Sequence, residues 1–444
     1  MADQFTFSIS NRHTSIDSLA TATTTSLTIV SAYWSFDNIT TDLYGVYNGQ
    51  TVNGATYSLA SSSYVGYGEA LSLTSSSSQA FQVSTPFLNL SYTSFTIEAW
   101  IYSTTSYTGD NGVFGQCQCS SCTNQCLYFI IRANRLYIGF TYNDLSGSST
   151  LTISTWYHIA FVYNYQNQQQ ILYLNGYQDN IKSNAQPYQG TNGTVQIGST
   201  QVFLSTNYFN GYIDNVKVST RAKSATEILN DASLTAYFSF DLPYPSNDNG
   251  PNGLNGTSAN TATVTGRVNQ ALVFTGSSSY FQVYGFYQLF GLYSNKPFSI
   301  SLWVNPTSTT SCSIIQQSTN QSGGTCLNMI GVWSTANYAG QLTVQGWAWP
   351  TIYGPYVTAN TWTHISWTYS VTNGYSLYVN GVLFGNTGSS GFSGSGSITW
   401  LQIGSGLACS SGSIPNTAYQ GAVDELYVHN RELSQTEVTT LANP

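Results

Sequence analysis

Charged side chains are scarce in this sequence, at 6% of 444 residues, whereas a typical soluble domain has about 25%. Ten Lys and Arg stand against 18 Asp and Glu, which gives a net charge of −8. So few basic residues provide no positive surface for the phosphates of a nucleic acid. No apolar run approaches the roughly 20 residues of a membrane-spanning helix. We therefore expect neither a nucleic-acid partner nor a membrane span.

We do not expect the segment that begins Met1-Ala-Asp-Gln to be a signal peptide, because it has neither a charged n-region nor an apolar h-region. Either the real N-terminus lies elsewhere, or this is a recombinant or processed form. Seven cysteines and five N-x-S/T sequons nevertheless suggest an oxidising, glycosylating compartment. We expect an extracellular, secreted protein that carries sugar on at least some sequons, despite the absence of a visible signal peptide. The sequon asparagines are Asn38, Asn89, Asn192, Asn255 and Asn320.

Aromatic residues make up 15% of the chain, and 34 of them are tyrosines. A surface so poor in charge must be built from hydroxyl, amide and phenol groups. Such a surface has little like-charge repulsion to keep molecules apart, which makes association easier.

Five motifs occur twice in the same order, about 200 residues apart, which indicates a duplicated domain. The first copy spans 31–231 and the second 232–444, without a Gly/Pro linker, and a Ser/Thr-rich arm of residues 1–30 precedes them. The pairs begin at Ala32 and Ala236, Phe95 and Phe298, Trp156 and Trp362, Leu172 and Leu377, and Gly211 and Gly421.

Short β-branched and aromatic segments predict strands over 95–101, 158–163 and 170–174. Asn-Gly follows the last of these at 175–176 and again at 380–381, as in tight turns between strands. The helical signals are capping boxes, Ser224-Ala-Thr-Glu227 and Ser434-Gln-Thr-Glu437. The pattern predicts an all-β chain of two tandem jelly-roll β-sandwiches, each ending in a short helix.

The residues near the end of each copy resemble a known family signature. Gly211-Tyr-Ile-Asp-Asn-Val216 and Gly421-Ala-Val-Asp-Glu-Leu426 each precede an arginine and the capping-box serine. The Trp-x-His-Ile and Leu-Tyr-x-Asn-Gly motifs accompany them. The chain thus resembles the laminin-G-like, concanavalin A-like lectin superfamily, which implies the jelly-roll fold. The resemblance does not determine function, because members of the superfamily bind glycans, proteins or calcium, or serve only as spacers between other domains.

Candidate catalytic groups are few. His158 and His364 occupy equivalent strand positions without an evident nucleophile nearby, so we favour hydrogen-bonded structural histidines over catalysts. Glycosidases of this scaffold need two carboxyl groups flanking the bond, but Glu98 is alone in its strand and Ser301 is its counterpart. We therefore expect no enzymatic activity and no required cofactor.

Four aspartates form a candidate calcium site, because calcium takes six to eight oxygen ligands. If the first and last strands of a copy are neighbours, two carboxylates meet in each domain. The alternative, which we favour, is that Asp214 and Asp424 accept backbone amides or pair with Arg221 and Arg431. The four candidates are Asp37, Asp214, Asp241 and Asp424.

The cysteines form one dense cluster and three scattered positions. The C-x-C-x2-C-x3-C spacing is cramped for a structural zinc site, so we favour two local disulfides among its members. Cys312 and Cys326 bracket the comparable loop of the second copy. We expect them to pair, which leaves Cys409 as the odd cysteine. The cluster consists of Cys117, Cys119, Cys122 and Cys126.

The densest aromatic run contains Trp347, Trp349, Tyr353 and Tyr356. Its alternate tryptophans share one face of a strand, either exposed to stack on sugars or partner proteins, or buried as core. The alternating counterpart at 136–142 favours packing.

Two functions follow as hypotheses. The first is a structural or adhesion protein that self-associates head to tail into an extracellular filament or matrix. The second is a lectin-like module that binds glycans or cell-surface proteins. For the first, Phe5, Phe7 and Ile9 alternate as in a half-buried strand, so the arm is a candidate for docking to a neighbouring molecule's sheet edge.

Overall fold

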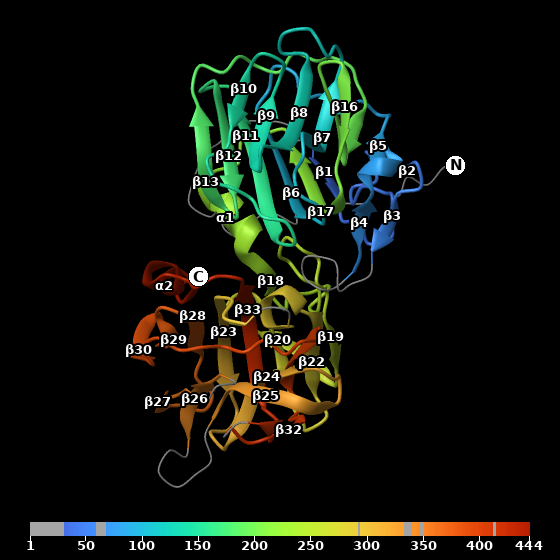
Figure 1. Cartoon of the computed structure of the whole chain (residues 1–444). Helices are drawn as coiled ribbons and strands as arrows, with labels where there is room; N and C mark the ends of the chain where they lie inside the picture. Colours follow the sequence, from blue (N-terminus) through green and yellow to red (C-terminus); the bar gives the residue numbers. More distant parts are fainter. Residues whose placement is uncertain (1–30, 59–67, 292–293, 333–339, 347–349, 412–413) are drawn as a thin grey trace, which may run out of the picture.

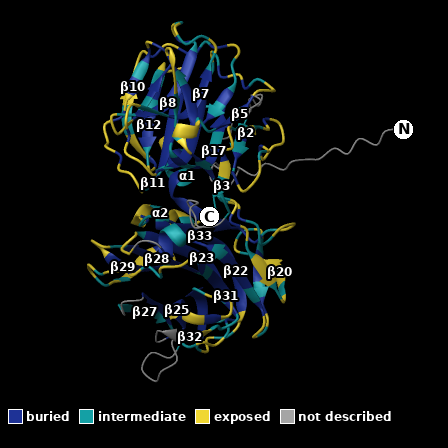
Figure 2. Cartoon of the chain, turned by 45° about the vertical axis from the view of Figure 1, so that its right-hand side comes forward, coloured by how far each residue is buried: buried dark blue, intermediate teal, exposed yellow. Residues whose placement is uncertain are grey.

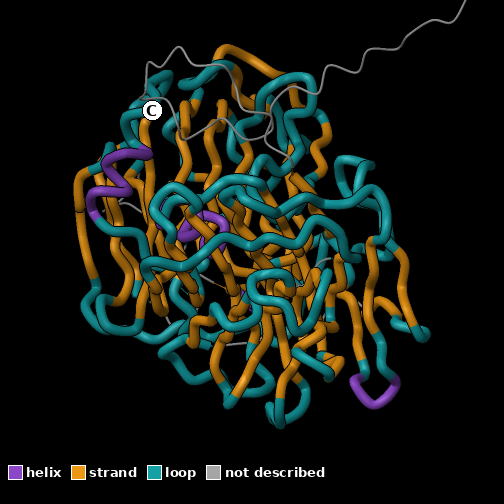
Figure 3. Tube along the Cα trace, turned by 90° about the horizontal axis from the view of Figure 1, so that it is seen from above, coloured by secondary structure: helices purple, strands orange, loops and turns teal. Residues whose placement is uncertain are grey.

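The computed structural model describes residues 31–58, 68–291, 294–332, 340–346, 350–411 and 414–444. These residues form two β-sandwiches, domain 1 (31–231) and domain 2 (232–444), stacked end on end in Figure 1. Strands and loops make up nearly all of the chain, with only short helical segments (Figure 3). The proposed arm residues Phe5, Phe7 and Ile9, and Trp347 and Trp349, lie outside the described residues.

Domain 1 consists mainly of two facing sheets. Sheet 1A has the order β13-β12-β11-β6-β17-β4-β3, with β1 also paired to β17, and sheet 1B has the order β10-β9-β8-β7-β14-β5-β2. The strands of sheet 1A are β1 (Ser31–Trp34), β3 (Thr56–Ser58), β4 (Ala70–Leu73), β6 (Phe95–Ser103), β11 (Trp156–Asn164), β12 (Gln169–Leu174), β13 (Tyr177–Lys182) and β17 (Gly211–Ser219). Those of sheet 1B are β2 (Gln50–Val52), β5 (Ala80–Val83), β7 (Asp110–Cys117), β8 (Cys126–Arg132), β9 (Arg135–Gly139), β10 (Asp144–Ser146) and β14 (Val195–Ile197). A separate hairpin, β15 (Ser199–Val202) and β16 (Ser205–Tyr208), and a short 3-10 helix, Ser75–Ser77, complete the domain.

Domain 2 repeats this architecture. Sheet 2A has the order β20-β21-β33-β23-β28-β29-β30, with β18 paired to β33, and sheet 2B has the order β19-β22-β31-β24-β25-β26-β27, with β32 paired to β25. The strands of sheet 2A are β18 (Leu234–Phe238), β20 (Thr261–Thr265), β21 (Gln270–Phe274), β23 (Phe298–Pro306), β28 (Thr363–Ser370), β29 (Gly374–Val379), β30 (Val382–Asn386) and β33 (Gly421–His429). Those of sheet 2B are β19 (Thr257–Ala259), β22 (Tyr280–Gly285), β24 (Cys312–Ser318), β25 (Gly323–Val332), β26 (Gln341–Gln345), β27 (Thr351–Tyr356), β31 (Thr399–Gly404) and β32 (Ala408–Ser411). A π-helix spans Tyr287–Gly291.

The strand orders of the two domains correspond one to one. In both, the first strand pairs with the last, and the last lies next to the strand of the Phe95 and Phe298 motifs. The duplication inferred from the paired motifs is therefore confirmed, together with the all-β sandwich class.

Alternation along the strands builds the cores. In β6, Phe95, Ile97 and Ile101 point between the sheets, whereas Glu98 and Trp100 alternate with them on the outer face. Figure 2 shows that burial is concentrated in the strands and that exposed residues gather in the loops. A single inward face per strand supplies the apolar area that holds the two sheets together.

Both predicted helix starts are confirmed. Helix α1 (Ala225–Ser233) and helix α2 (Gln435–Leu441) begin after Ser224 and Ser434, whose side chains accept the Glu227 and Glu437 amides in capping boxes. Strand β18 begins at Leu234, directly after α1 ends. No helix among the described residues has the length and apolarity that a membrane crossing requires.

The domains also contact each other. Trp100 and Trp156, on the outer face of sheet 1A, belong to the same apolar cluster as the core of domain 2. Helix α2 and the C-terminus lie at this junction in Figures 1 and 2. The Nζ of Lys217 in domain 1 donates a hydrogen bond to the carbonyl oxygen of Pro251 in domain 2, at 2.7 Å.

Two disulfides hold the β7–β8 loop, and a third joins strands β25 and β32. The preference for two local bridges in the cysteine cluster is confirmed, as Cys117–Cys126 and Cys119–Cys122. The predicted Cys312–Cys326 bridge is wrong, because Cys326 bonds to Cys409.

The register of the β24–β25 hairpin explains this error. Cys312 lies opposite Val332, and Cys326 lies opposite Ser318, so the two cysteines occupy opposite ends of the hairpin. Strand β32 runs beside β25 and brings Cys409 to Cys326. The buried Cys312 is the free thiol among the described residues.

Candidate functional site

A pocket of about 320 Å³ opens at the junction of the two domains. Trp100, Trp156 and Tyr177 line it from domain 1, and Phe286 and Leu289 line it from domain 2. Tyr177 is 62% exposed, so its ring faces solvent at the mouth. The polar and charged side chains of the lining include Asn175, Gln288, Lys296, Asn430 and Arg431.

The Trp-x-His and Asn-Gly motifs position the domain 1 wall. The Asn-Gly turn has positive φ at Asn175 and Gly176, as a tight hairpin requires. The Oδ1 of Asn175 accepts the His158 amide at 3.0 Å, and the Asn175 amide donates to the His158 carbonyl at 2.7 Å. The turn is thereby fixed beside Trp156. Asn380 and His364 make the same two bonds in domain 2.

Trp156 is held by aromatic neighbours on the outer face of sheet 1A. Its ring centroid lies 5.5 Å from that of Tyr102 and 6.5 Å from that of Tyr212. Such contacts limit rotation of the indole and keep a flat apolar surface in place at the pocket.

A buried ion cluster lies beneath the aromatic wall, also on the outer face of sheet 1A. The Nζ of Lys223 forms ion pairs with Glu98 and, at 2.6 Å, with Asp231. The Nε2 of His158 lies 3.6 Å from the Oε1 of Glu98. Only 2% of the Glu98 side chain and 7% of the Lys223 side chain are exposed, so solvent cannot reach this carboxylate.

Burial sets the protonation of this cluster. It raises the pKa of Glu98, and the nearby Lys223 offsets that only in part. Burial also favours the neutral form of Asp231, but the charges of Lys223 and Lys217 outweigh it and hold the pKa of Asp231 below its usual range. Burial lowers the pKa of His158 to about 3, so this imidazole is neutral at pH 7.

The cluster cannot work as a pair of glycosidase acids. Its two carboxylates, Glu98 and Asp231, bind the same ammonium group, whereas hydrolysis requires carboxyl groups on either side of an accessible bond. The cluster also has no equivalent in domain 2, where Ser301, Leu433 and Leu441 take the places of Glu98, Lys223 and Asp231. Its position indicates a structural role between sheet 1A, α1 and the junction.

The histidines are buried and packed against aromatic side chains, as the structural interpretation predicts. His364 is 1% exposed, its ring lies 5.3 Å from that of Trp303, and burial lowers its pKa to about 3. No nucleophile hydrogen-bonds to His158 or His364 among the described contacts.

The aspartates of the calcium hypothesis accept backbone amides. The Oδ2 of Asp424 accepts the amides of Arg267 and Val268, and the Oδ1 of Asp241 accepts that of Gln270 on the same β20–β21 hairpin. In domain 1, Asp37 accepts the Glu69 amide and Asp214 accepts that of Asn215.

The amide-acceptor alternative is therefore confirmed for both Asp214 and Asp424. Arg221 and Arg431 pair with Glu227 and Glu437 instead. Within the described ranges, no three His, Cys, Asp or Glu side chains gather as metal ligands. Calcium binding at these aspartates stays a prediction.

The remaining predicted site residues are dispersed. Tyr353 and Tyr356 lie on β27, and Tyr356 is 66% exposed. All five sequon asparagines are exposed, so each is accessible to glycosylation, whose occurrence stays a prediction: Asn38, Asn89, Asn192, Asn255 and Asn320.

Sequence reasoning missed the junction pocket and the ion cluster. One signal was available for the cluster: Lys217, Lys223 and Asp231 are charged only in the first copy, at positions where the second copy has Tyr427, Leu433 and Leu441. For the pocket there was none, because its walls come from two domains.

Comparison with known protein families identifies the family to which this fold belongs. A family model of the concanavalin A-like lectin/glucanases superfamily matches residues 74–229 and 275–439. No curated protein matches the sequence.

Solved structures with some likeness include carbohydrate-active proteins. Domain 4 of a GH43 extracellular arabinanase from Geobacillus stearothermophilus, in complex with arabinotriose, is 22% identical, with a TM-score of 0.34, over 47% of this chain and 98% of its own. Trypanosoma rangeli sialidase in complex with sialic acid is 14% identical, with a TM-score of 0.39, over 82% of this chain and 65% of its own. The CBM40 of Ruminococcus gnavus IT-sialidase is 17% identical, with a TM-score of 0.28, over 31% of this chain and 82% of its own.

Proposed function

This chain belongs to the concanavalin A-like lectin/glucanase superfamily through both of its domains, and from that premise we propose that it is a non-enzymatic glycan-binding protein. The observation that carries the proposal is the junction pocket, where Trp156 and Tyr177 stand beside Asn175 and Gln288. Aromatic rings can stack on the apolar face of a sugar, and amide side chains can bond its hydroxyls.

The size of the pocket limits the ligand. Small-molecule sites usually measure about 300 to 1,000 Å³, so a pocket of about 320 Å³ suits one or two sugar units at the end of a glycan. Three disulfides fit the extracellular location that such a ligand implies.

Binding to a glycan array, followed by calorimetry on the best glycan, tests the proposal. We expect Tyr177→Ala to weaken binding at least tenfold, because it removes the exposed ring at the mouth. Tyr142→Ala is the matched control, since Tyr142 is 66% exposed in the β9–β10 turn, away from the pocket. Equal affinity of both variants and wild type would contradict the proposal.

The non-enzymatic part is tested separately. We expect the purified protein to release no reducing sugar from polysaccharides, because Glu98 and Asp231 are buried on one lysine. Release that Glu98→Gln abolishes would overturn this expectation.

Self-association is a second candidate function, which the edge strand β30 favours. Val382, Leu383 and Phe384 are consecutive and are 69%, 46% and 50% exposed. Strand β30 ends the order of sheet 2A, and an apolar edge strand is a ready surface for pairing with another chain. We propose a second copy as the partner, with two β30 strands paired antiparallel about a two-fold axis.

The equivalent edge strand of domain 1, β13, differs from β30 because it is polar. Strand β13 carries Asp179 and Lys182, and the Asp179 carboxylate accepts the amides of Ser148 and Ser149. Charge and a bound loop thus protect the β13 edge of sheet 1A, whereas β30 at the equivalent edge of sheet 2A carries no charged residue.

Sedimentation velocity tests this second candidate. We expect Leu383→Lys to convert dimers to monomers, whereas Ile181→Lys on β13 leaves the dimer intact. Monomeric wild type would contradict pairing through β30. Head-to-tail growth through the arm is a different prediction: deletion of residues 2–24 should reduce the assembly measured by light scattering, and unchanged size would refute it.

A further inference from the structure

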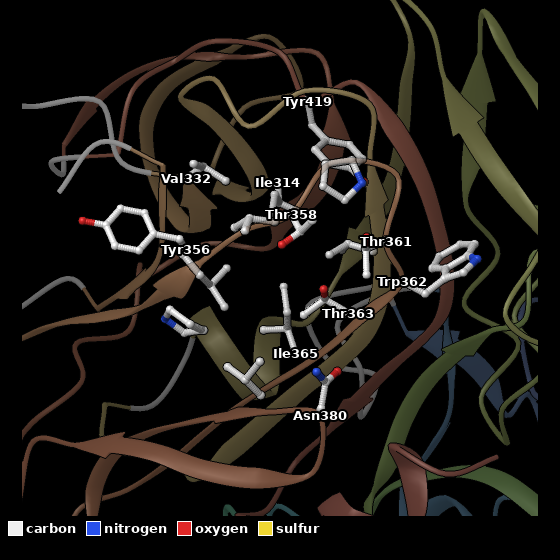
Figure 4. Close-up of a pocket in the computed structure, with 16 residues that line it drawn as sticks. Ile314, Val332, Tyr356, Thr358, Thr361, Trp362, Thr363, Ile365, Asn380 and Tyr419 are labelled. Atoms are coloured by element: carbon white, nitrogen blue, oxygen red, sulfur yellow. The ribbon is translucent and has the colours of Figure 1, made fainter.

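A second pocket, of about 230 Å³, lies within domain 2, away from the junction residues of the glycan proposal. Its floor comes from the inward faces of both sheets, so the pocket enters the space between them. Figure 4 shows Ile365 in the middle of the pocket, with Tyr356 and Trp362 on opposite sides. The floor consists of Val304, Ile314, Val332, Leu342 and Ile365, all buried.

The comparison with domain 1 explains why this space is open. The main sheets of the two domains have matching strand orders, so Trp362-Thr363-His364 corresponds to Trp156-Tyr157-His158. In domain 1, the Tyr157 ring packs against the core, and the buried Tyr107 lies close enough to interact with it electrostatically. Domain 2 has Thr363 in place of Tyr157.

The second phenol ring of domain 1 is also missing. Tyr107 lies in the loop that follows β6, and the corresponding residues 307–311 of domain 2 are only serine and threonine. Two large aromatic side chains are thus replaced by small ones. The space that they fill in domain 1 remains as a pocket in domain 2.

The lining determines which chemistry can enter. The floor residues are aliphatic, and no charged side chain lines the pocket. The hydroxyl of the buried Tyr419 already donates to the Ala422 carbonyl at 2.9 Å. A sugar or an ion would lose its hydration at this floor without gaining partners, which is costly.

The mouth of the pocket is polar and aromatic. Thr358, Thr361 and Asn380 are exposed there, beside Tyr356 and Trp362. The Oδ1 of Asn380 accepts the His364 amide at 2.9 Å, which leaves its amide nitrogen as a donor at the rim. A ligand with an apolar ring and one polar substituent matches both regions.

The volume sets the size of that ring. A buried apolar cavity of about 150 Å³ is enough to hold benzene, and this pocket is larger. We propose that the domain 2 pocket binds a small, uncharged aromatic molecule of one or two rings, with the ring on the aliphatic floor and a polar substituent at the mouth. This site is independent of the proposed glycan site, which lies at the domain junction.

Indole is the probe for the test, because it has two fused rings, no charge and one N–H donor. Calorimetry and saturation-transfer NMR on the full chain should show saturable binding at one site per molecule. Thr363→Tyr restores the phenol of domain 1 and should weaken indole binding at least tenfold. Because the new ring fills an open pocket, the melting temperature should be unchanged or higher. Thr265→Tyr, at an exposed position of β20, adds the same group elsewhere and should bind indole as wild type does.

Two results would contradict binding of an aromatic molecule in the domain 2 pocket. Absence of saturable binding to wild type, or equal binding by Thr363→Tyr, would overturn the proposal. If Thr363→Tyr does not fold, Val379→Phe fills the same pocket from β29 and takes its place under the same criteria. Glycan binding should be unchanged in either variant, so failure of this proposal leaves the glycan proposal standing.

Discussion

Three charged side chains of domain 1 are buried together in one ion cluster. With charged residues at 6% of the chain, the concentration of Glu98, Lys223 and Asp231 behind one sheet is notable. A buried ion pair must recover the solvation that both ions lose, and it does so only with close partners. At the equivalent positions, domain 2 has the uncharged residues Ser301, Leu433 and Leu441.

We expect Lys223→Met to destabilise domain 1 by roughly 3 to 5 kcal/mol, because it leaves two carboxylates buried without their cation. The triple variant Glu98→Ser, Lys223→Leu and Asp231→Leu copies the set of domain 2 and should recover most of this loss. Urea unfolding of both variants provides the measurement. A triple variant as unstable as Lys223→Met would show that the ions stabilise the domain as a network.

A buried histidine predicts sensitivity to acid. Burial lowers the pKa of His364 to about 3, below its ordinary value. The unfolded chain therefore takes up a proton near pH 6.5 and the folded chain does not, so stability present above pH 6.5 is lost as the pH falls toward 3. By pH 4 this single group should cost on the order of 3 kcal/mol.

Melting temperatures at pH 7 and pH 4 measure this effect. His364→Gln cannot titrate, so its melting temperature should fall less between the two values than that of wild type. The difference between the two proteins isolates His364 from the carboxylates, whose titration both share. An equal fall would contradict a neutral, buried His364.

At the scale of elements, the two copies share strands and helix caps but differ in how their loops are closed. Cys326–Cys409 joins positions 83 residues apart, whereas Cys119–Cys122 joins positions 3 apart. In the chain-entropy account, a cross-link stabilises by restricting the unfolded chain, more so for a longer loop.

We therefore expect Cys409→Ser to cost about 4 to 5 kcal/mol and Cys119→Ser about 2 kcal/mol at most. Without reductant, the melting temperature should fall further for Cys409→Ser than for Cys119→Ser. With reductant, the melting temperatures of both variants should approach that of wild type. Alkylation of unfolded wild type should modify one thiol, Cys312, which the fold buries. Modification of Cys409 in wild type would contradict this pairing.

At the scale of the whole molecule, the junction makes the two sandwiches one unit. Domain 1 contributes Trp100 and Trp156 to the apolar cluster of domain 2. Lys217 reaches across to the Pro251 carbonyl, and its ammonium group lies 4.8 Å from the Tyr33 ring centre. A fixed junction is what a pocket built from both domains requires.

Calorimetric unfolding tests the coupling of the domains. We expect wild type to unfold in one transition and Lys217→Met to unfold in two, because the substitution removes a charged hydrogen bond worth about 1.5 to 3 kcal/mol. Lys182→Met is the control, since Lys182 binds the Asn143 side chain within domain 1. It should lower the melting temperature without splitting the transition, and two transitions in wild type would contradict the coupling.

The sequence by itself determined the duplication, the β-sandwich class, the Asn-Gly turns and the helix starts at Ser224 and Ser434. The turns and the helix starts follow from residues within one short segment, where turn and capping chemistry act locally. The duplication follows from five motifs that recur in the same order, and the sandwich class from many short strand-like segments with alternating side chains. It also indicated local bridges in the cysteine cluster, since those cysteines are only a few residues apart.

Only the tertiary structure decided which distant residues meet. The pairing of Cys326 with Cys409 depends on β32 lying beside β25, and the Glu98–Lys223 contact joins positions 125 residues apart. The pocket of domain 2 depends on a threonine where domain 1 has Tyr157, which matters only because both positions face the interior between two sheets. The periodicity of a strand fixes which face a side chain takes, but the neighbour on that face comes from another strand and its register.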